Sequence, residues 1–132
     1  MSLPPLTWFD GVWHEGNPPI VGPMTHSLWM ASAVFDGARA FRGLAPDLDR
    51  HCGRVVDSAR AFGMTPALSP EEIYQLAWDG IEKFPPATEL YIRPMFYFED
   101  GFVTPDLATS RFILSVFEKP IPPWRGPCHR RN

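Results

Sequence analysis

The run 90–98 constrains this chain most, because it predicts one long strand whose two faces differ in chemistry. Side chains alternate along a strand, so Tyr91, Arg93, Met95 and Tyr97 are expected on one face. A guanidinium among large apolar side chains is costly unless an anion meets it, and its planar fork suits a carboxylate or a phosphate. The strand therefore presents Arg93 as a candidate anion receptor.

A structural role for Arg93 is the alternative. Its apolar stem can lie along the sheet while its charged head reaches water. The head can also pair with a neighbouring acid, either Glu89 or Glu99. The strand alone leaves both interpretations open.

The composition indicates a globular domain with many loops, since 45% of the 132 residues are hydrophobic, 14% are aromatic and 16 are prolines. This length suits one domain with one core, and is short for an enzyme that encloses a cofactor by itself.

A net charge of -3 gives no electrostatic footprint for nucleic acid, and no apolar run approaches membrane-spanning length. The N-terminus lacks a basic segment followed by an apolar one, so we expect a cytoplasmic protein. Cys52 and Cys128 have no metal-ligand or disulfide-framework spacing, so we expect incidental thiols and no metal site.

Turn residues and apolar runs predict the strands. Short aromatic runs flank Asp10-Gly11 in residues 7–14, which predicts a β-hairpin. Residues 34–41 are predicted as a strand interrupted at Asp36-Gly37, where a bulge or a close approach of another group to the backbone is expected. The remaining predicted strands are 89–98 and 111–118.

Helical spacing and capping residues predict three helices. They are expected over about 28–33, over 47–63 or 49–63, and over 69–84. Thr25 or Ser27 can cap the first, and the third is the best marked because Ser69, Pro70 and Glu72 supply a cap, a first-turn proline and a capping-box acid. Strands and helices together predict an α+β domain, a mostly antiparallel sheet with two or three helices packed on one face.

The last thirteen residues differ in character from the rest of the chain. Residues 120–124 are typical of an interdomain linker, and residues 125–132 show no periodicity. We therefore expect a small domain over 1–119, followed by a linker and a truncated or non-native tail over 120–132.

Four blocks of residues, taken in order, resemble the fold class IV pyridoxal-phosphate-dependent aminotransferases, and within them the branched-chain amino acid aminotransferases. The blocks are the Trp8–Trp13 hairpin, Val34–Phe41, Leu48–Met64 with His51 and Arg54, and Tyr91-Ile92-Arg93-Pro94. The similarity covers residues 7–123. It implies the small N-terminal domain of that family, which precedes a larger cofactor-bearing domain.

The resemblance implies roles for charged and aromatic residues. Arg54 matches the arginine that contacts the 5′-phosphate of the cofactor, a role that its fork geometry suits. A solvated arginine paired with Asp57 or with a neighbour of Arg50 is the alternative. Tyr91 and Arg93 match a pair that lines the substrate pocket, where the arginine helps to hold the substrate carboxylate.

The resemblance also implies three residues near the substrate side chain. Phe35 matches an aromatic wall of the pocket, and an ordinary core phenylalanine is the alternative. Val103 matches a loop residue that reaches the active site of the neighbouring subunit, so a homodimer is expected. Met30 stands where the branched-chain enzymes usually carry a tyrosine, so a different amine or amino acid substrate stays open.

Transamination requires a lysine that forms the Schiff base with pyridoxal 5′-phosphate and an acid that keeps the pyridine nitrogen protonated. Family enzymes carry both in the larger domain. The two lysines here are Lys83, whose charge complements a helix end, and Lys119, beside the linker. Neither matches the Schiff-base position. We therefore expect no catalytic residue, no bound cofactor and no turnover in this chain alone.

Three functions remain open. The first is a fragment of an aminotransferase that moves an amino group between a branched-chain-type amino acid and a 2-oxo acid. The second keeps the fold and changes the chemistry, as in D-amino acid or amine transaminases and aminodeoxychorismate lyase. The third is a non-catalytic domain that dimerises or binds a ligand, for which an exposed apolar face would be evidence. The block Tyr91 to Pro94 favours the first function, and Met30 favours considering the second.

Overall fold

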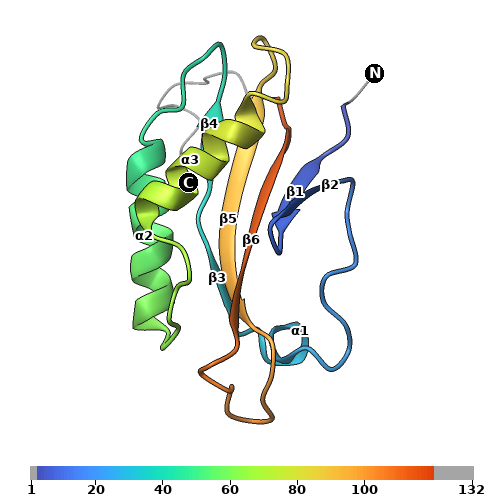
Figure 1. Cartoon of the computed structure of the whole chain (residues 1–132), viewed down its shortest axis with the longest axis vertical. Helices are drawn as coiled ribbons and strands as arrows, with labels where there is room; N and C mark the ends of the chain where they lie inside the picture. Colours follow the sequence, from blue (N-terminus) through green and yellow to red (C-terminus); the bar gives the residue numbers. More distant parts are fainter. Residues whose placement is uncertain (1–2, 121–132) are drawn as a thin grey trace, which may run out of the picture.

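Two long strands, β5 (Leu90–Phe98) and β6 (Ser110–Glu118), form the centre of the fold in the computed structural model, which describes residues 3–120 (Figure 1). They pair antiparallel along their whole length, from Leu90 opposite Glu118 to Phe98 opposite Ser110. On the other side of β6 lies β1 (Leu6–Phe9), and β2 (Val12–Glu15) pairs with β1. Every pairing in the six-stranded sheet is antiparallel, which confirms the predicted sheet type.

The predicted N-terminal hairpin is confirmed. Asp10 and Gly11 form its two-residue turn with positive φ angles of 55° and 84°. Positive φ at both positions is the geometry of a type I′ turn, whose twist matches that of the strands it joins.

The other edge of the sheet is broken as predicted. Both β3 (Ala33–Phe35) and β4 (Ala38–Ala40) pair with β5, and Asp36-Gly37 separates them. The Asp36 N–H donates to the Pro94 carbonyl at 3.1 Å. A Cβ at position 37 would lie only 2.5 Å from the Tyr91 hydroxyl oxygen. Glycine is therefore needed here because the Tyr91 ring lies against the backbone.

Two helices, α2 (Leu48–Ala61) and α3 (Pro70–Ile81), cover one face of the sheet (Figure 1). The predicted capping box is present, with Glu72 N–H donating to the Ser69 hydroxyl at 3.1 Å and Ser69 N–H donating to the Glu72 carboxylate at 2.8 Å. This helix ends three residues before the predicted position 84. Within residues 3–120, no helix combines the length and apolar character needed to cross a membrane.

The short helix α1 (His26–Met30) is shifted from its predicted position at 28–33. Thr25 is the N-cap residue, but its hydroxyl does not cap the helix and instead accepts a hydrogen bond from Gly22 N–H at 2.9 Å. The helix ends early because Ala31 adopts a left-handed φ of 57° and Ala33 already pairs with Tyr97 of β5.

The two faces of β5 differ as the alternation predicts. On the helix-covered face, β5 contributes Leu90, Ile92, Phe96 and Phe98, each at most 2% exposed. On the open face, Tyr91, Arg93 and Met95 stay partly exposed. The buried core therefore lies between the sheet and α2 and α3, and the opposite face of the sheet is not covered by these helices.

Candidate functional site

Arg93 lies on the open face with its guanidinium beside two aromatic rings that contact each other. Its guanidinium carbon is 5.2 Å from the centre of the Tyr91 ring and 5.5 Å from that of Phe117. The Nε atom is buried and has no hydrogen-bond partner in the described part of the chain. Glu99, a candidate partner, pairs with Arg111 at 2.8 Å instead. The geometry leaves Arg93 suited to an anion that approaches the open face.

Arg54 belongs to a charged cluster at the adjacent sheet edge. Its Nε and Nη2 atoms donate to the two carboxylate oxygens of Asp36, each at 2.9 Å, and His51 Nδ1 lies 2.6 Å from the same carboxylate. Burial opposes ionisation of Asp36, but hydrogen bonds from Arg54 and His51 outweigh it and hold the pKa of this carboxyl below its usual 3.8. The alternative pairing of Arg54 with Asp57 is therefore wrong.

The Arg54 cluster and the open face are connected through β5. Asp36 is hydrogen-bonded to the Pro94 carbonyl, and the next residue, Gly37, lies against the Tyr91 hydroxyl. The side chain of Arg54 remains 66% exposed, so it can also meet an anion from outside. One edge of the sheet thus brings a basic group close to the strand that carries Tyr91 and Arg93.

The three apolar site residues lie at exposed positions. Phe35 pairs with Met95 across β3 and β5 and is 61% exposed, so the alternative of an ordinary core phenylalanine is wrong. Met30 ends α1, and Val103 lies in the loop between β5 and β6. These two segments meet at one end of the molecule, where the Trp29 and Phe102 rings lie 5.8 Å apart (Figure 1).

A cavity of about 350 Å³ adjoins Arg93 on the open face. Met95 and Tyr97 of β5 line it, and the segment 17–28 contributes to its wall. The Tyr97 hydroxyl is buried and has no hydrogen-bond partner among residues 3–120. Alternation placed Tyr97 on this face, but the sequence carried no signal that the segment between β2 and α1 would fold beside it.

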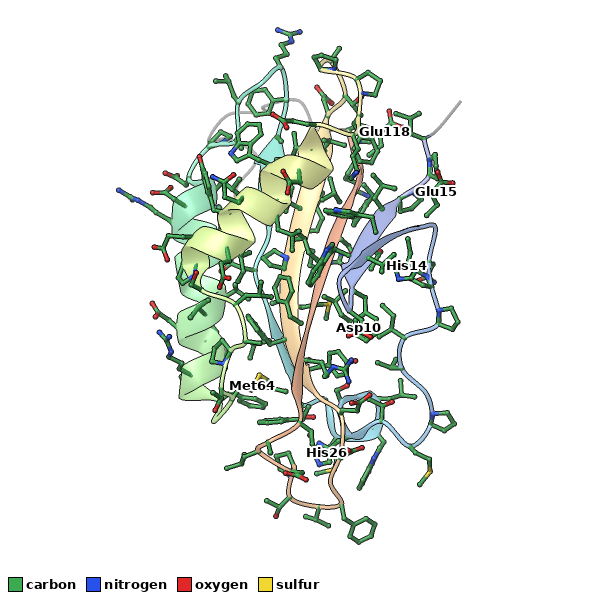
Figure 2. The ribbon with its side chains drawn as sticks, viewed as in Figure 1. Asp10, His14, Glu15, His26, Met64 and Glu118 are labelled. Atoms are coloured by element: carbon green, nitrogen blue, oxygen red, sulfur yellow. The ribbon has the colours of Figure 1, made fainter. Side chains whose placement is uncertain are left out.

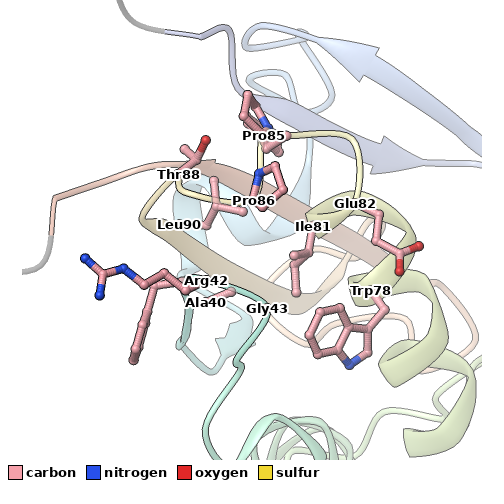
Figure 3. A pocket seen from close by; sticks show the side chains of 12 residues that line it. Ala40, Arg42, Gly43, Trp78, Ile81, Glu82, Pro85, Pro86, Thr88 and Leu90 are labelled. Atoms are coloured by element: carbon pink, nitrogen blue, oxygen red, sulfur yellow. The ribbon is translucent and has the colours of Figure 1, made fainter.

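A second cavity, of about 390 Å³, lies at the other end of the sheet beside the end of α3 (Figure 3). Trp78, Ile81 and Pro86 are among the residues that line it. None of the buried unpartnered polar atoms in the described residues belongs to this cavity.

The lysines and the cysteine of the described chain show no catalytic arrangement. Lys83 Nζ lies 5.8 Å from the centre of the Trp13 ring, and Lys119 follows β6, where its backbone N–H donates to Glu89. Burial, and then the charges of Asp49 and Asp36, raise the pKa of the Cys52 thiol to about 12, which fits an unreactive thiol.

Residues 3–120 hold no group of three His, Cys, Asp or Glu side chains that could bind a metal ion. Cys128 and the predicted tail from 121 onward lie outside the described residues.

Solved structures with a similar fold include aminotransferases. An aminotransferase from Brucella abortus, bound to the cofactor pyridoxal phosphate, is 42% identical and superposes with a TM-score of 0.89 over 94% of this chain and 45% of that one. The branched-chain amino acid aminotransferase of Escherichia coli is 26% identical with a TM-score of 0.79, over 89% of this chain and 40% of the enzyme.

Two relatives found by sequence are named branched-chain-amino-acid aminotransferases. A probable branched-chain-amino-acid aminotransferase of Rickettsia felis is 33% identical over 100 residues, which are 74% of this chain and 34% of the relative. The branched-chain-amino-acid aminotransferase of Salmonella typhimurium is 29% identical over 124 residues, which are 89% of this chain and 38% of the enzyme. No family model matches the chain. The chain therefore spans between a third and a half of the length of these proteins.

Fold and sequence together define a small-domain unit of the fold class IV aminotransferases. Within that class, the chain matches an N-terminal fragment of the branched-chain amino acid aminotransferase fold. The predicted antiparallel α+β domain of this family is confirmed.

The donor groups of the site fit the acidic parts of pyridoxal phosphate and of an amino acid. Arg54 is an exposed guanidinium at the sheet edge, and Arg93 has a buried Nε without a partner in the described structure. Guanidinium forks bind phosphate and carboxylate oxygens in pairs. This chain can therefore contribute anion-binding groups to a cofactor and substrate site.

Proposed function

We propose that this chain is part of a pyridoxal-phosphate-dependent aminotransferase and that its open sheet face forms one wall of the active site. The complete enzyme moves an amino group between a branched-chain-type amino acid and a 2-oxo acid. One observation carries this proposal: the 42% identity and TM-score of 0.89 shared with the pyridoxal-phosphate-bound aminotransferase of Brucella abortus. The names of the sequence relatives support the substrate class.

In this proposal Arg93 and Tyr91 receive the substrate carboxylate. The Tyr91 and Phe117 rings, which contact each other, lie beside the Arg93 guanidinium, and its buried Nε gains a partner when a carboxylate binds. Phe35, Met30 and Val103 supply apolar surface for the substrate side chain. Their exposure in the described structure supports this role.

Arg54 is proposed to hold the 5′-phosphate of the cofactor. Asp36 fixes the Arg54 side chain by two hydrogen bonds, and His51 fixes Asp36 in turn. Pyridoxal phosphate, when bound, supplies the electron sink that makes the substrate amino group transferable. We infer that the Schiff-base lysine lies in the larger domain that follows residues 1–119 in the complete protein, after a linker that begins at 120.

We also propose that two copies of the domain pair through the end that carries α1 and the loop between β5 and β6. Large apolar side chains gather there in exposed positions, and they include Met24 at 86%, Phe102 at 78% and Val103 at 64% exposure. Exposed apolar patches of this kind mark contact surfaces. Light scattering that shows a clean monomer at high protein concentration would contradict the pairing.

A chimera tests the proposed function directly. Residues 3–120 replace the structurally aligned part of the Brucella abortus aminotransferase, and the product is assayed for the pyridoxal phosphate absorbance band and for transamination of 2-oxo acids. We expect a folded chimera with both. In the chimera, Arg54→Leu is expected to weaken cofactor binding, while Arg93→Leu raises the KM for the 2-oxo acid and leaves the cofactor band in place.

Arg60→Leu serves as the control, because Arg60 is an exposed arginine near the end of α2, outside the Asp36 cluster. A chimera that binds pyridoxal phosphate but responds equally to the Arg60, Arg54 and Arg93 substitutions would contradict the proposed roles.

The chain alone is expected to be inactive. Mixed with pyridoxal phosphate, reduced with borohydride and dialysed, it should retain no specific chromophore, because neither Lys83 nor Lys119 matches the Schiff-base lysine. Turnover of pyruvate or 2-oxoglutarate by the purified chain, or a single lysine labelled in stoichiometric amount, would overturn this expectation.

A further inference from the structure

The Asp36 carboxylate joins two basic side chains of α2 at the sheet edge. Arg54 donates to it through Nε and Nη2, each at 2.9 Å, and His51 Nδ1 lies 2.6 Å from the same carboxylate. The side chain of Asp36 is 9% exposed and that of His51 is 21% exposed. The charge of His51 therefore decides the net charge of the cluster that would meet a phosphate at Arg54.

The carboxylate fixes where the first proton of the His51 ring lies. Burial opposes ionisation of Asp36, but hydrogen bonds from Arg54 and His51 hold the pKa of this carboxyl below its usual value, so it is an anion at neutral pH. An ionised carboxylate only accepts hydrogen bonds, so Nδ1 of His51 carries the hydrogen. The approach of Arg54 Nη2 to this nitrogen, at 3.5 Å, is therefore a contact between two donors.

The second ring nitrogen of His51 is open to protonation. Nε2 has no hydrogen bond within residues 3–120 and is not one of the buried unpartnered atoms there, so it reaches solvent. Since Nδ1 already carries a hydrogen, a proton that adds to Nε2 converts the ring to an imidazolium. Histidine is the side chain that changes charge between about pH 5 and pH 8. Protonation of His51 can thus respond to an anion that binds beside it.

The charges of the cluster explain why this proton matters. Arg54 and Asp36 have opposite charges and contact each other, so they cancel toward an approaching dianion. With a neutral His51 the three groups have no net charge, and with an imidazolium they have one net positive charge. Close by on the helix, Arg50 is already paired with Asp47 at 4.0 Å. In the described structure no hydrogen bond or ion pair joins the His51 side chain to α3 or to a strand of the sheet.

Arg54 keeps part of its guanidinium available. The pair with Asp36 uses Nε and Nη2, so Nη1 has no partner among the described residues. A phosphate can therefore bind to Arg54 without displacing Asp36. His51 and Arg54 are three residues apart on α2, so they lie on the same face of the helix. An anion held by Arg54 is thus close to the charge of an imidazolium at His51.

We propose that His51 is a second cationic residue of the phosphate site, and that an anion which binds at Arg54 takes up a proton at His51 Nε2. This deepens the proposed function and rests on it for the identity of the anion as the 5′-phosphate of pyridoxal phosphate. Asp36 then orients Arg54 and faces a charged ring instead of a neutral one. The affinity of the site for a dianion falls as the pH rises, because His51 loses its proton.

Sulfate is the probe, because it stays dianionic where histidine titrates, whereas a phosphate ester itself takes up a proton near about pH 6. The full chain is labelled with nitrogen isotope and titrated with sulfate at about pH 5.5 and about pH 8, at constant ionic strength. The amide signal of Gly37, whose N–H donates to Asp36 at 2.9 Å, reports binding in the NMR spectrum. We expect sulfate to bind about five- to tenfold more tightly at the lower pH, as one added charge near the surface would produce.

His51→Asn tests the role of the proton, because the asparagine amide can still donate to Asp36 but does not become charged. It should keep the affinity that the natural chain has at the higher pH and lose the gain at the lower pH. His51→Gln, titrated in the same way, replaces it if the asparagine disturbs the amide spectrum. Arg54→Leu should weaken sulfate binding at both pH values. Equal affinities in the natural chain, a gain that survives loss of His51, or no binding that depends on Arg54 would overturn the proposal.

His14→Asn is the matched control, because His14 is a partly exposed histidine on β2, at the opposite edge of the sheet from β3 (Figure 2). It should retain the pH dependence of sulfate binding. Because the titration uses neither pyridoxal phosphate nor the chimera, a failure of the proton coupling is separable from a failure of the proposed aminotransferase role.

Discussion

The two faces of the central sheet differ in what determines their side chains. On the face beneath α2 and α3, Ile92 and Phe96 are at most 1% exposed and their shape must fit a packed core. One residue further along the same strand, Arg93 carries a charge whose Nε has no protein partner in the described residues. One strand therefore supplies closely packed apolar side chains on one face and a charged side chain whose Nε has no protein partner in the described residues on the other.

The largest expected effect is the difference in unfolding free energy between a substitution on the covered face and one on the open face. Phe96→Ala should cost about 3–5 kcal/mol of unfolding free energy, because it leaves a cavity in the core. Phe35→Ala, on the open face and 61% exposed, should change stability by no more than about 0.5 kcal/mol. Urea unfolding of both variants measures the difference. Similar losses for the two would break the distinction between the faces.

A smaller effect is expected at Asp36-Gly37, the interruption between β3 and β4 on the edge of the sheet. Gly37→Ala should cost about 1–3 kcal/mol, because the added methyl group overlaps the Tyr91 ring. In a Tyr91→Ala background the same substitution should cost no more than about 0.5 kcal/mol. Urea unfolding of the four proteins in this double-mutant cycle measures the coupling. Additive losses of unfolding free energy would mean that glycine is required at position 37 for a reason other than the Tyr91 ring.

The smallest effect concerns pH and the Asp36 cluster. Since the pKa of Asp36 is lower in the folded state than its usual 3.8, the ionised carboxylate stabilises the fold above about pH 4. This contribution is lost as the pH falls through the lowered pKa. Asp36→Asn should therefore reduce stability at pH 7, by less than Gly37→Ala, and the difference from the natural chain should shrink below pH 4. Thermal unfolding between pH 7 and pH 3 tests this.

Asp57→Asn is the control for that experiment, because Asp57 is an exposed acid on α2 only three residues after Arg54. It should unfold like the natural chain at every pH. A loss equal to that of Asp36→Asn would mean that the measured effect reflects general charge and not the Arg54 cluster.

Elements whose signals are local were predicted well from the sequence. Ser69 and Glu72 are three residues apart and form both hydrogen bonds of the capping box. Asp10 and Gly11 form the hairpin turn without help from the rest of the chain. In both cases the neighbouring residues determine the conformation, so a short window of sequence is sufficient.

Features that depend on distant residues were missed. Arg54 pairs with Asp36, eighteen positions earlier, and not with nearby Asp57. The interruption between β3 and β4 at Asp36-Gly37 brings the Asp36 carboxylate to α2. Helix α1 is shifted because Ala33 must pair with Tyr97. The unpartnered hydroxyl of Tyr97 depends on the ion pairs of Arg111 and on the path of residues 17–28, neither of which has a local signature.

The pairing of β1 with β6 has a consequence for how the protein is made. Leu6 of β1 lies opposite Val116 of β6, so β1 meets this partner only after more than a hundred further residues have been synthesised. At roughly 5–20 residues per second, this takes about 5–20 s. During that time the N-terminal hairpin has no sheet to join, while β5 and β6 can pair as soon as both have emerged. The β1–β2 hairpin is therefore incorporated into the sheet long after its own synthesis, and a chaperone would have this time to bind it.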